Sequence, residues 1–243
     1  MQRELDVSEE IVRDLLSIAG TDIVIIADDS GSMSSVSDYS NVNSPRTRWM
    51  ELKDTLLDLV EMLLLVDHAD GFTLKFLNDP LYYQVASRAA VEKIFASAKP
   101  RGGTPLAKNL RDVFSGNWMA KEKQGETKDV VVLCATDGEP GDITFANLQT
   151  MLRNRPMTPY PFFVTFLMCT EEDDIVEKYD SCIDPIPGCD VVDDYLSERK
   201  QVQKMKKSQS FSRARWLAKA TLAGKMPKYD RMDSPQGGCC TVM

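Results

Sequence analysis

The sequence predicts an α/β fold, in which a mostly parallel β-sheet is covered by helices on both faces. Apolar runs at 23–27, 130–135 and 162–168 are rich in Val, Ile and Phe and show no polar alternation. Such runs are typical of buried parallel strands. Segments with helical spacing of apolar residues lie between these runs. Strands that alternate with helices along the chain indicate a parallel sheet with helices packed on both sides.

The remaining elements follow from shorter patterns. Residues 72–77 and 81–85 alternate more strongly and flank the turn sequence Asn78-Asp79-Pro80, which predicts a hairpin at one sheet edge. Val191-Val192 predicts a short last strand. Helical periodicity and capping signals predict helices within the first twenty residues and over about 46–66, 87–100, 104–114, 144–153, 171–180, 195–206 and 211–223. The helix at 104–114 is expected to start with Thr104 as N-cap and Pro105 at the first helical position.

Length and composition favour one globular domain. The 243 residues are 43% apolar and 27% charged, which is ordinary for a soluble protein. We expect a helical lead-in over 1–17, the domain over 18–223, and a flexible Pro/Lys/Asp/Ser/Gly-rich tail over 224–243. Neither a signal-peptide core nor an apolar run of the roughly 20 residues that span a bilayer is seen, so we expect a cytoplasmic protein.

The charge is unevenly distributed. The net charge is −8, yet residues 199–243 alone carry eleven Lys and Arg against two Asp. The first 198 residues are therefore strongly acidic, which argues against nucleic acid as a partner of the main domain. The basic segment could lie against an anionic membrane surface, or it could be a solvated helix face beside an acidic domain.

Several kinds of active site are excluded by what the chain lacks. It has one histidine and no C-x₂-C pair, so a zinc site is not expected. It also has neither a phosphate-binding loop nor a dinucleotide-binding glycine pattern, and no catalytic triad is supported. A dehalogenase-type phosphatase would need a second Asp where Ser30 stands. We therefore do not expect an enzyme.

Oxygen-bearing side chains gather where predicted strands end. Asp28-Asp29-Ser30-Gly31-Ser32 follows the first apolar run, and Asp137 follows the run at 130–135. The carboxyl ends of neighbouring parallel strands meet at one edge of a sheet. Arg101-Gly102-Gly103-Thr104-Pro105 adds a hydroxyl at a predicted helix start. Carboxylates and hydroxyls are hard ligands that suit Mg²⁺ or Mn²⁺. The candidate metal ligands are Asp28, Ser30, Ser32, Thr104 and Asp137.

These five residues resemble the metal-ion-dependent adhesion site of von Willebrand factor A domains. The three segments of that pattern occur here in order, as DDSGS, GGTPL and ATDG, and the resemblance covers roughly residues 18–200. It implies a Rossmann-like, doubly wound sheet of six strands in the order 3-2-1-4-5-6, with one antiparallel edge strand. The hairpin predicted at 72–85 falls where that edge strand is expected.

The resemblance also implies a binding function. Three of the five ligands are neutral hydroxyls, so little negative charge quenches the cation, and Mg²⁺ keeps positions that an outside ligand can take. In the family that ligand is an Asp or Glu side chain of a protein partner. We expect Asp29 and Glu139, which flank the site, to form the partner-binding rim. Two alternatives are a metal-dependent hydrolase, with Asp29 or Glu139 as general base, and a constitutive scaffold subunit of a larger complex with a structural metal.

The last residues predict a lipid anchor. Cys240-Thr241-Val242-Met243 matches a prenylation box in which the final Met favours farnesyl, although Thr241 is not aliphatic. A chance match is the alternative. One lipid binds a membrane only marginally, so we expect a second signal from a palmitoyl group on Cys239 and from the basic segment. This predicts a eukaryotic protein, peripheral on the cytosolic face of a membrane.

Overall fold

The structure of the chain is a computed structural model. It describes residue 5 and residues 7–37, 44–65, 71–116, 118–119, 128–158, 160–205 and 211–232. The predicted lipidation sites Cys239 and Cys240 lie outside the described residues.

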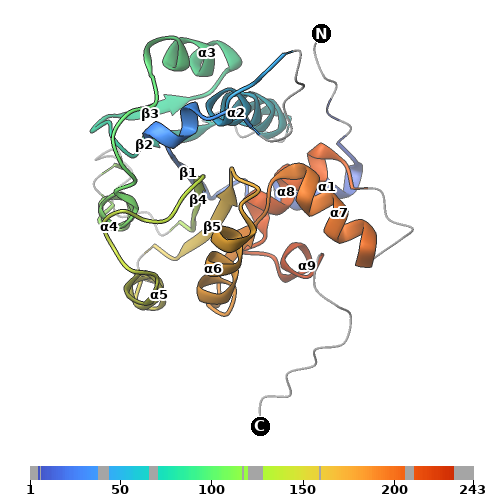
Figure 1. The fold of residues 1–243 in the computed structure, drawn as a ribbon. Helices are drawn as coiled ribbons and strands as arrows, with labels where there is room; N and C mark the ends of the chain where they lie inside the picture. Colours follow the sequence, from blue (N-terminus) through green and yellow to red (C-terminus); the bar gives the residue numbers. More distant parts are fainter. Residues whose placement is uncertain are drawn as a thin grey trace.

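In the described part of the chain, six strands form one sheet in the order β3-β2-β1-β4-β5-β6 (Figure 1). The strands are β1 (Asp22–Ala27), β2 (Phe72–Phe76), β3 (Tyr82–Val85), β4 (Val130–Thr136), β5 (Phe162–Met168) and β6 (Cys189–Val192). All neighbouring pairs are parallel except β2 and β3, which form the predicted antiparallel hairpin at the edge. The predicted fold class, strand order and edge strand are confirmed.

Helices cover both faces of this sheet (Figure 1). The helices are α1 (Glu9–Leu16), α2 (Arg48–Leu64), α3 (Arg88–Ser97), α4 (Leu106–Phe114), α5 (Phe145–Arg153), α6 (Asp173–Ile183), α7 (Tyr195–Met205), α8 (Arg213–Leu222), α9 (Pro227–Asp230) and a short 3₁₀ turn η1 (Gly31–Ser34). Helices α1, α2 and α8 contribute to the core on one face, and α4, α5 and α6 to the core on the other.

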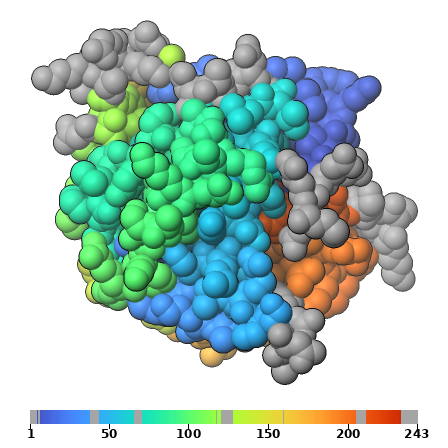
Figure 2. All heavy atoms as spheres, turned by 90° about the horizontal axis from the view of Figure 1, so that it is seen from above, coloured from blue at the N-terminus to red at the C-terminus, as the bar shows by residue number. Residues whose placement is uncertain are grey.

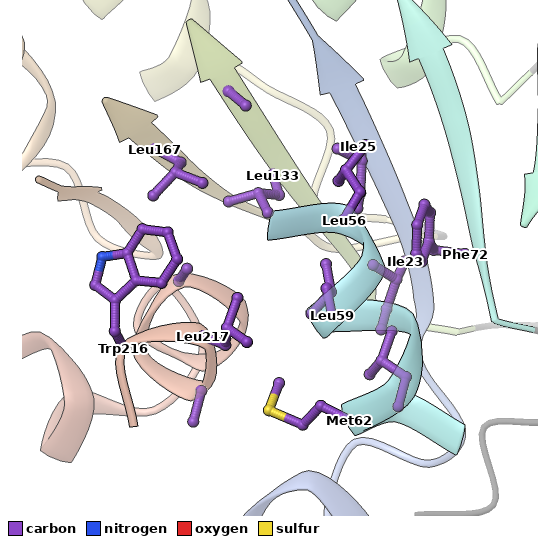
Figure 3. Close-up of a cluster of buried hydrophobic side chains, with 14 of the residues drawn as sticks. Ile23, Ile25, Leu56, Leu59, Met62, Phe72, Leu133, Leu167, Trp216 and Leu217 are labelled. Atoms are coloured by element: carbon purple, nitrogen blue, oxygen red, sulfur yellow. The ribbon is translucent and has the colours of Figure 1, made fainter. Parts of the chain in front are cut away.

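The alternation of side chains along the central strands explains their apolar sequences. In β1, Ile23 and Ile25 point toward α2 and α8, where they join Leu56 and Leu217 (Figure 3). The intervening residues of β1 face the opposite side and join the core under α4 and α6. Because both faces of the sheet are covered, every position of β1 after Asp22 is buried.

The start of α4 differs from the prediction. Helix α4 begins at Leu106, and the residue before it, Pro105, makes no side-chain capping bond. The cap comes instead from Asp142, whose carboxylate accepts hydrogen bonds from the backbone N–H groups of Ala107 at 3.0 Å and Lys108 at 2.8 Å. An acidic side chain is favoured at a helix N-terminus, and here it is supplied by a loop distant in sequence. Thr104 is therefore not the N-cap.

The C-terminal segment also differs from the prediction, because packed structure continues beyond residue 224. Helix α9 buries Tyr229, which is 1% exposed and donates a hydrogen bond from its hydroxyl to Asp14 at 2.7 Å. The first residues of the predicted flexible tail therefore belong to the folded body. Among the described helices, none is both long and apolar enough to cross a bilayer.

Basic side chains of this segment pair with the acidic body. Lys219 lies 2.6 Å from Glu198, and both side chains are almost fully buried. Lys225 pairs with Asp129 at 2.6 Å. Lys219 therefore cannot face a membrane, and the basic segment offers less outward charge than its sequence predicts.

Candidate metal site

The site is built around Asp28, which directly follows β1. Its backbone N–H donates to the carbonyl of Ala135 at 2.8 Å, so the residue continues the pairing of β1 with β4. One carboxylate oxygen accepts from the N–H of Ser30 at 2.7 Å, and the other accepts from the hydroxyl of Thr136 at 2.6 Å. Burial raises the pKa of Asp28, although these hydrogen bonds oppose the rise. No ion pair with Asp28 is found among the described residues, so its buried charge is held by neutral donors alone.

Two serines connect Asp28 to Asp137. The hydroxyl oxygens of Ser30 and Ser32 lie 2.9 Å apart, and the Ser32 hydroxyl donates to a carboxylate oxygen of Asp137 at 2.8 Å. Ser32 lies on η1, whose tight turn brings both hydroxyls to the same side of the loop. The result is a connected set of hydrogen bonds between the ends of β1 and β4.

The segment that carries Thr104 is tied to both of these loops through its backbone. The N–H of Gly31 donates to the carbonyl of Gly102 at 3.2 Å, and the N–H of Gly141 donates to the carbonyl of Thr104 at 2.8 Å. Gly102 has a φ of 76°, and a Cβ there would approach the Asn78 side chain to 2.6 Å, so the glycine is required. Figure 2 shows the loop after β1 and the start of α2, in blue, beside the green segment that leads to α4. The structure thus brings all five predicted ligand positions to one sheet edge.

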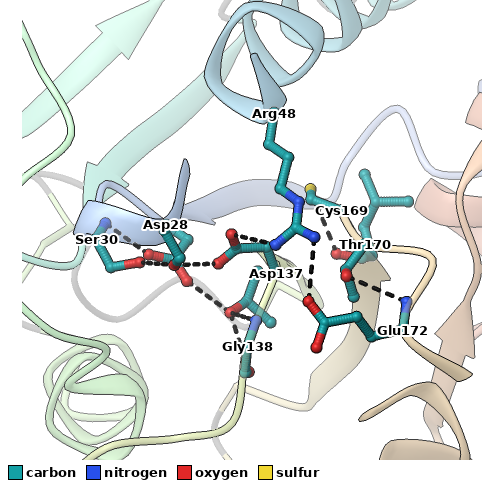
Figure 4. Close-up of polar contacts among 11 residues, drawn as sticks. Asp28, Ser30, Arg48, Asp137, Gly138, Cys169, Thr170 and Glu172 are labelled. Carbon is teal, nitrogen blue, oxygen red and sulfur yellow. Dashed lines mark hydrogen bonds and ion pairs between the residues drawn. The ribbon is translucent and has the colours of Figure 1, made fainter. Parts of the chain in front are cut away.

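Arg48 is part of this site, although it is not among the residues that we predicted from the sequence. Its Nη1 donates to Asp137 at 3.0 Å and its Nη2 to Glu172 at 3.2 Å (Figure 4). The Asp137 side chain is fully buried and that of Arg48 is 11% exposed. Burial lowers the pKa of Arg48, but the hydrogen bonds to Asp137 and Glu172 outweigh this and raise it. A signal for Arg48 does exist, because a cation in the first turn of a helix opposes the helix dipole and needs another reason to be there.

The two predicted rim residues behave differently. Asp29 is 3% exposed, and its carboxylate accepts hydrogen bonds from the backbone and side-chain amides of Asn78, at 2.8 and 2.9 Å. Burial raises its pKa. Asp29 therefore holds the loop after β2 and offers no surface to a partner, which corrects our assignment. Glu139 stays half exposed and pairs with Lys178. Neither carboxylate is placed as the free general base that a hydrolase would need.

The residues fit a hard cation. The donor set is two carboxylates and three hydroxyls, and the described residues contain no group of three or more His, Cys, Asp or Glu arranged to hold a metal ion. Oxygen ligands with few charges suit Mg²⁺ or Mn²⁺. The buried Asp28 carboxylate, without a cationic partner, is the observation that a bound metal would explain.

Comparison with known proteins adds solved structures of the same class of fold. No protein-family model matches the sequence, and no curated protein matches it. The VWA domain of SpRpn10 aligns with a TM-score of 0.48 and 12% identity, covering 71% of this chain and 87% of that one. The proximal thread matrix protein 1 of the mussel byssus aligns with a TM-score of 0.46 and 15% identity, covering 71% of this chain and 43% of that one. At these identities and scores, the likenesses support no inference about function.

Proposed function

We propose that this chain is a von Willebrand factor A-type binding module that holds Mg²⁺ and captures an acidic side chain of a protein partner. The proposal is carried by one observation, the hydrogen bonds that join the loop after β1 to Asp137: the Ser30 N–H donates to the Asp28 carboxylate, the Ser30 and Ser32 hydroxyls bond each other, and the Ser32 hydroxyl donates to Asp137. Thr104 completes the proposed ligand set. Mn²⁺ is an alternative occupant with the same ligand preferences.

The proposed division of roles follows from burial and charge. Asp28 and Asp137 supply the negative charge, and the three hydroxyls supply neutral oxygens that leave the cation electron-poor. A bound Mg²⁺ would supply a position for the carboxylate of a partner. Glu139, exposed beside the site, is proposed to contact that partner.

Metal binding is tested by titrating the purified protein with Mg²⁺ in a calorimeter. Asp28→Ala should abolish binding, because it removes the charged ligand at the centre of the site. The matched control is Asp22→Asn, which changes a carboxylate at the opposite end of the same strand and should leave the affinity unchanged. Equal affinity of the wild-type protein and Asp28→Ala would reject the site.

Partner capture is tested with immobilised protein in a cell lysate, in Mg²⁺ or in EDTA. Proteins that are retained by the wild type in Mg²⁺, and lost both in EDTA and with Asp28→Ala, support the proposal. Retention that ignores both changes would favour the constitutive scaffold alternative. Turnover of generic phosphate or ester substrates that depends on Asp28 would favour the hydrolase.

We also propose a membrane tether through a farnesyl group on Cys240, with palmitoylation of Cys239 as a second signal. Because Lys219 and Lys225 pair within the fold, the tether would depend more on lipid than on the basic segment. The Cys240→Ser variant should move the full-length protein from the membrane fraction to the soluble fraction of eukaryotic cells. A variant that fractionates like the wild type would contradict the tether.

A further inference from the structure

The Arg48 side chain places its positive charge against a carboxylate of the proposed metal site. Its guanidinium group spans two carboxylates, with Nη1 on Asp137 at 3.0 Å and Nη2 on Glu172 at 3.2 Å. The two carboxylates differ in environment. Asp137 is fully buried and also accepts from Ser32, whereas the Glu172 side chain is 57% exposed. Arg48 thus reaches from the predicted metal ligands to the protein surface.

We propose that Arg48 is a built-in competitor of the metal, which holds Asp137 when no metal is bound and lowers the affinity of the site for divalent cations. This inference rests on the proposed metal site and goes beyond it, because it concerns how strongly the site binds. The residue is a regulator of the ligand set and not a ligand itself.

The electrostatic argument is direct. A guanidinium remains charged at every accessible pH, so it adds one positive charge beside the two carboxylates that would hold Mg²⁺. Like charges at short range repel strongly in a partly buried site, where water screens them little. The hydrogen bond from Arg48 also occupies one carboxylate oxygen of Asp137. A metal must therefore overcome both the repulsion and the bond.

The structure also provides a place for Arg48 to withdraw. Glu172 already accepts its second nitrogen and lies nearer the solvent. Arg48 borders a cavity of about 330 Å³ that is lined also by Glu51, Thr170 and Asp194. A small rotation of the side chain could release Asp137 and keep the ion pair with Glu172. By holding Arg48 away from Asp137, Glu172 would then favour metal binding without being a metal ligand itself.

The test compares Mg²⁺ affinities by calorimetry. The Arg48→Gln variant should bind Mg²⁺ about tenfold more tightly than the wild type, because it loses the competing charge. Glu172→Gln should bind several-fold more weakly, because Arg48 loses its alternative partner. The matched control is Arg46→Gln, which removes the same charge two residues away, where Arg46 pairs with Asp54 at 2.6 Å. Its affinity should remain within about twofold of the wild type.

The outcomes separate this inference from the proposed function. Equal or weaker binding by Arg48→Gln would overturn the competitor role and leave the metal site intact. If neither the wild type nor any variant binds Mg²⁺ or Mn²⁺, the proposed function fails and this inference fails with it. Circular dichroism and a thermal melt confirm folding. Should Arg48→Gln not fold, Arg48→Met and the charge-retaining Arg48→Lys replace it, and only the uncharged variant should gain affinity.

Discussion

At the scale of single residues, the site shows how a buried charge is held without an opposite charge. Asp28 depends on a backbone N–H and on the hydroxyl of Thr136. Hydrogen bonds to a charged acceptor contribute more to stability than those between neutral groups. Thr136 is therefore a structural support of the proposed metal ligand, one residue before Asp137.

We predict that Thr136→Val destabilises the metal-free protein by about 2 kcal/mol, because the Asp28 carboxylate loses a donor that no water can replace. The measurement is urea denaturation. The control is Thr221→Val, which removes a similarly buried hydroxyl that donates to the neutral carbonyl of Leu217 at 2.8 Å. The control should cost less. A larger cost for Thr221→Val would contradict the special role of Thr136.

The sequence predicted some residues of the site and missed others for a physical reason. Asp28, Ser30 and Asp137 lie within three residues of the end of an apolar run, so their place at the sheet edge follows from chain order. Arg48 and Glu172 reach the site from α2 and from the loop before α6, and their contacts with it depend on tertiary packing. The unfavourable place of Arg48 in the first turn of α2 is a local signal, but it does not say which carboxylates the side chain would meet. The mistaken rim residue Asp29 has the same cause, since neighbours in a turn can point to opposite sides.

At the scale of elements, loops at the sheet edge position the ends of helices. The Asp142 carboxylate receives two N–H groups from the first turn of α4, whose preceding loop carries Thr104. A cap supplied by a residue 35 positions away cannot be predicted from local sequence. The strands were predictable because their burial on both faces demands continuous apolar runs.

We predict that Asp142→Ala lowers the free energy of unfolding by about 1 kcal/mol, since two N–H groups lose their acceptor. It should also weaken Mg²⁺ binding, because the segment that holds Thr104 leads directly into α4. Thr144→Ala is the matched control. It removes the N-cap of α5, which contributes no ligand, and should reduce stability while leaving the Mg²⁺ affinity unchanged. Unchanged Mg²⁺ affinity in Asp142→Ala would show that this cap does not support the proposed metal site.

The junction of β6 and α7 should give a pH-dependent stability. Burial, together with the neighbouring Asp194 charge, raises the pKa of Asp193 to about 7. A carboxyl with a raised pKa binds its proton more tightly in the folded state. The Asp193 carboxyl therefore lowers stability as the pH rises from about 4, the ordinary pKa of an Asp side chain, to about 7, its pKa in the folded protein. This loss of stability persists at higher pH.

We predict that Asp193→Asn, which mimics the protonated side chain, stabilises the protein at pH 8 and has little effect at pH 4. Urea denaturation at both pH values measures the difference. An equal effect at both pH values would show that the charge of Asp193 does not matter.

At the scale of the whole molecule, the C-terminal helices bind the acidic body through ion pairs. Lys219 of α8 meets Glu198 of α7 in the interior, and Arg215 meets Glu10 of α1 at 3.0 Å. Part of the basic charge in the C-terminal segment is therefore used to pair with acidic residues inside the folded protein. For this basic segment we expected either a membrane-facing surface or a solvated helix face, because ion pairing across the fold leaves no periodic signal in the sequence.

The buried pair gives the last prediction. Lys219→Met should destabilise the protein by about 3–5 kcal/mol, because it removes one partner of a buried ion pair and leaves the other partner's charge in the interior. The double variant Lys219→Met/Glu198→Gln should recover much of that loss, since it removes both charges of the pair. Urea denaturation of both single variants and the double variant forms a double-mutant cycle. If the single and double variants are equally unstable, packing around α8 and not the charge pair holds the C-terminal helices in place.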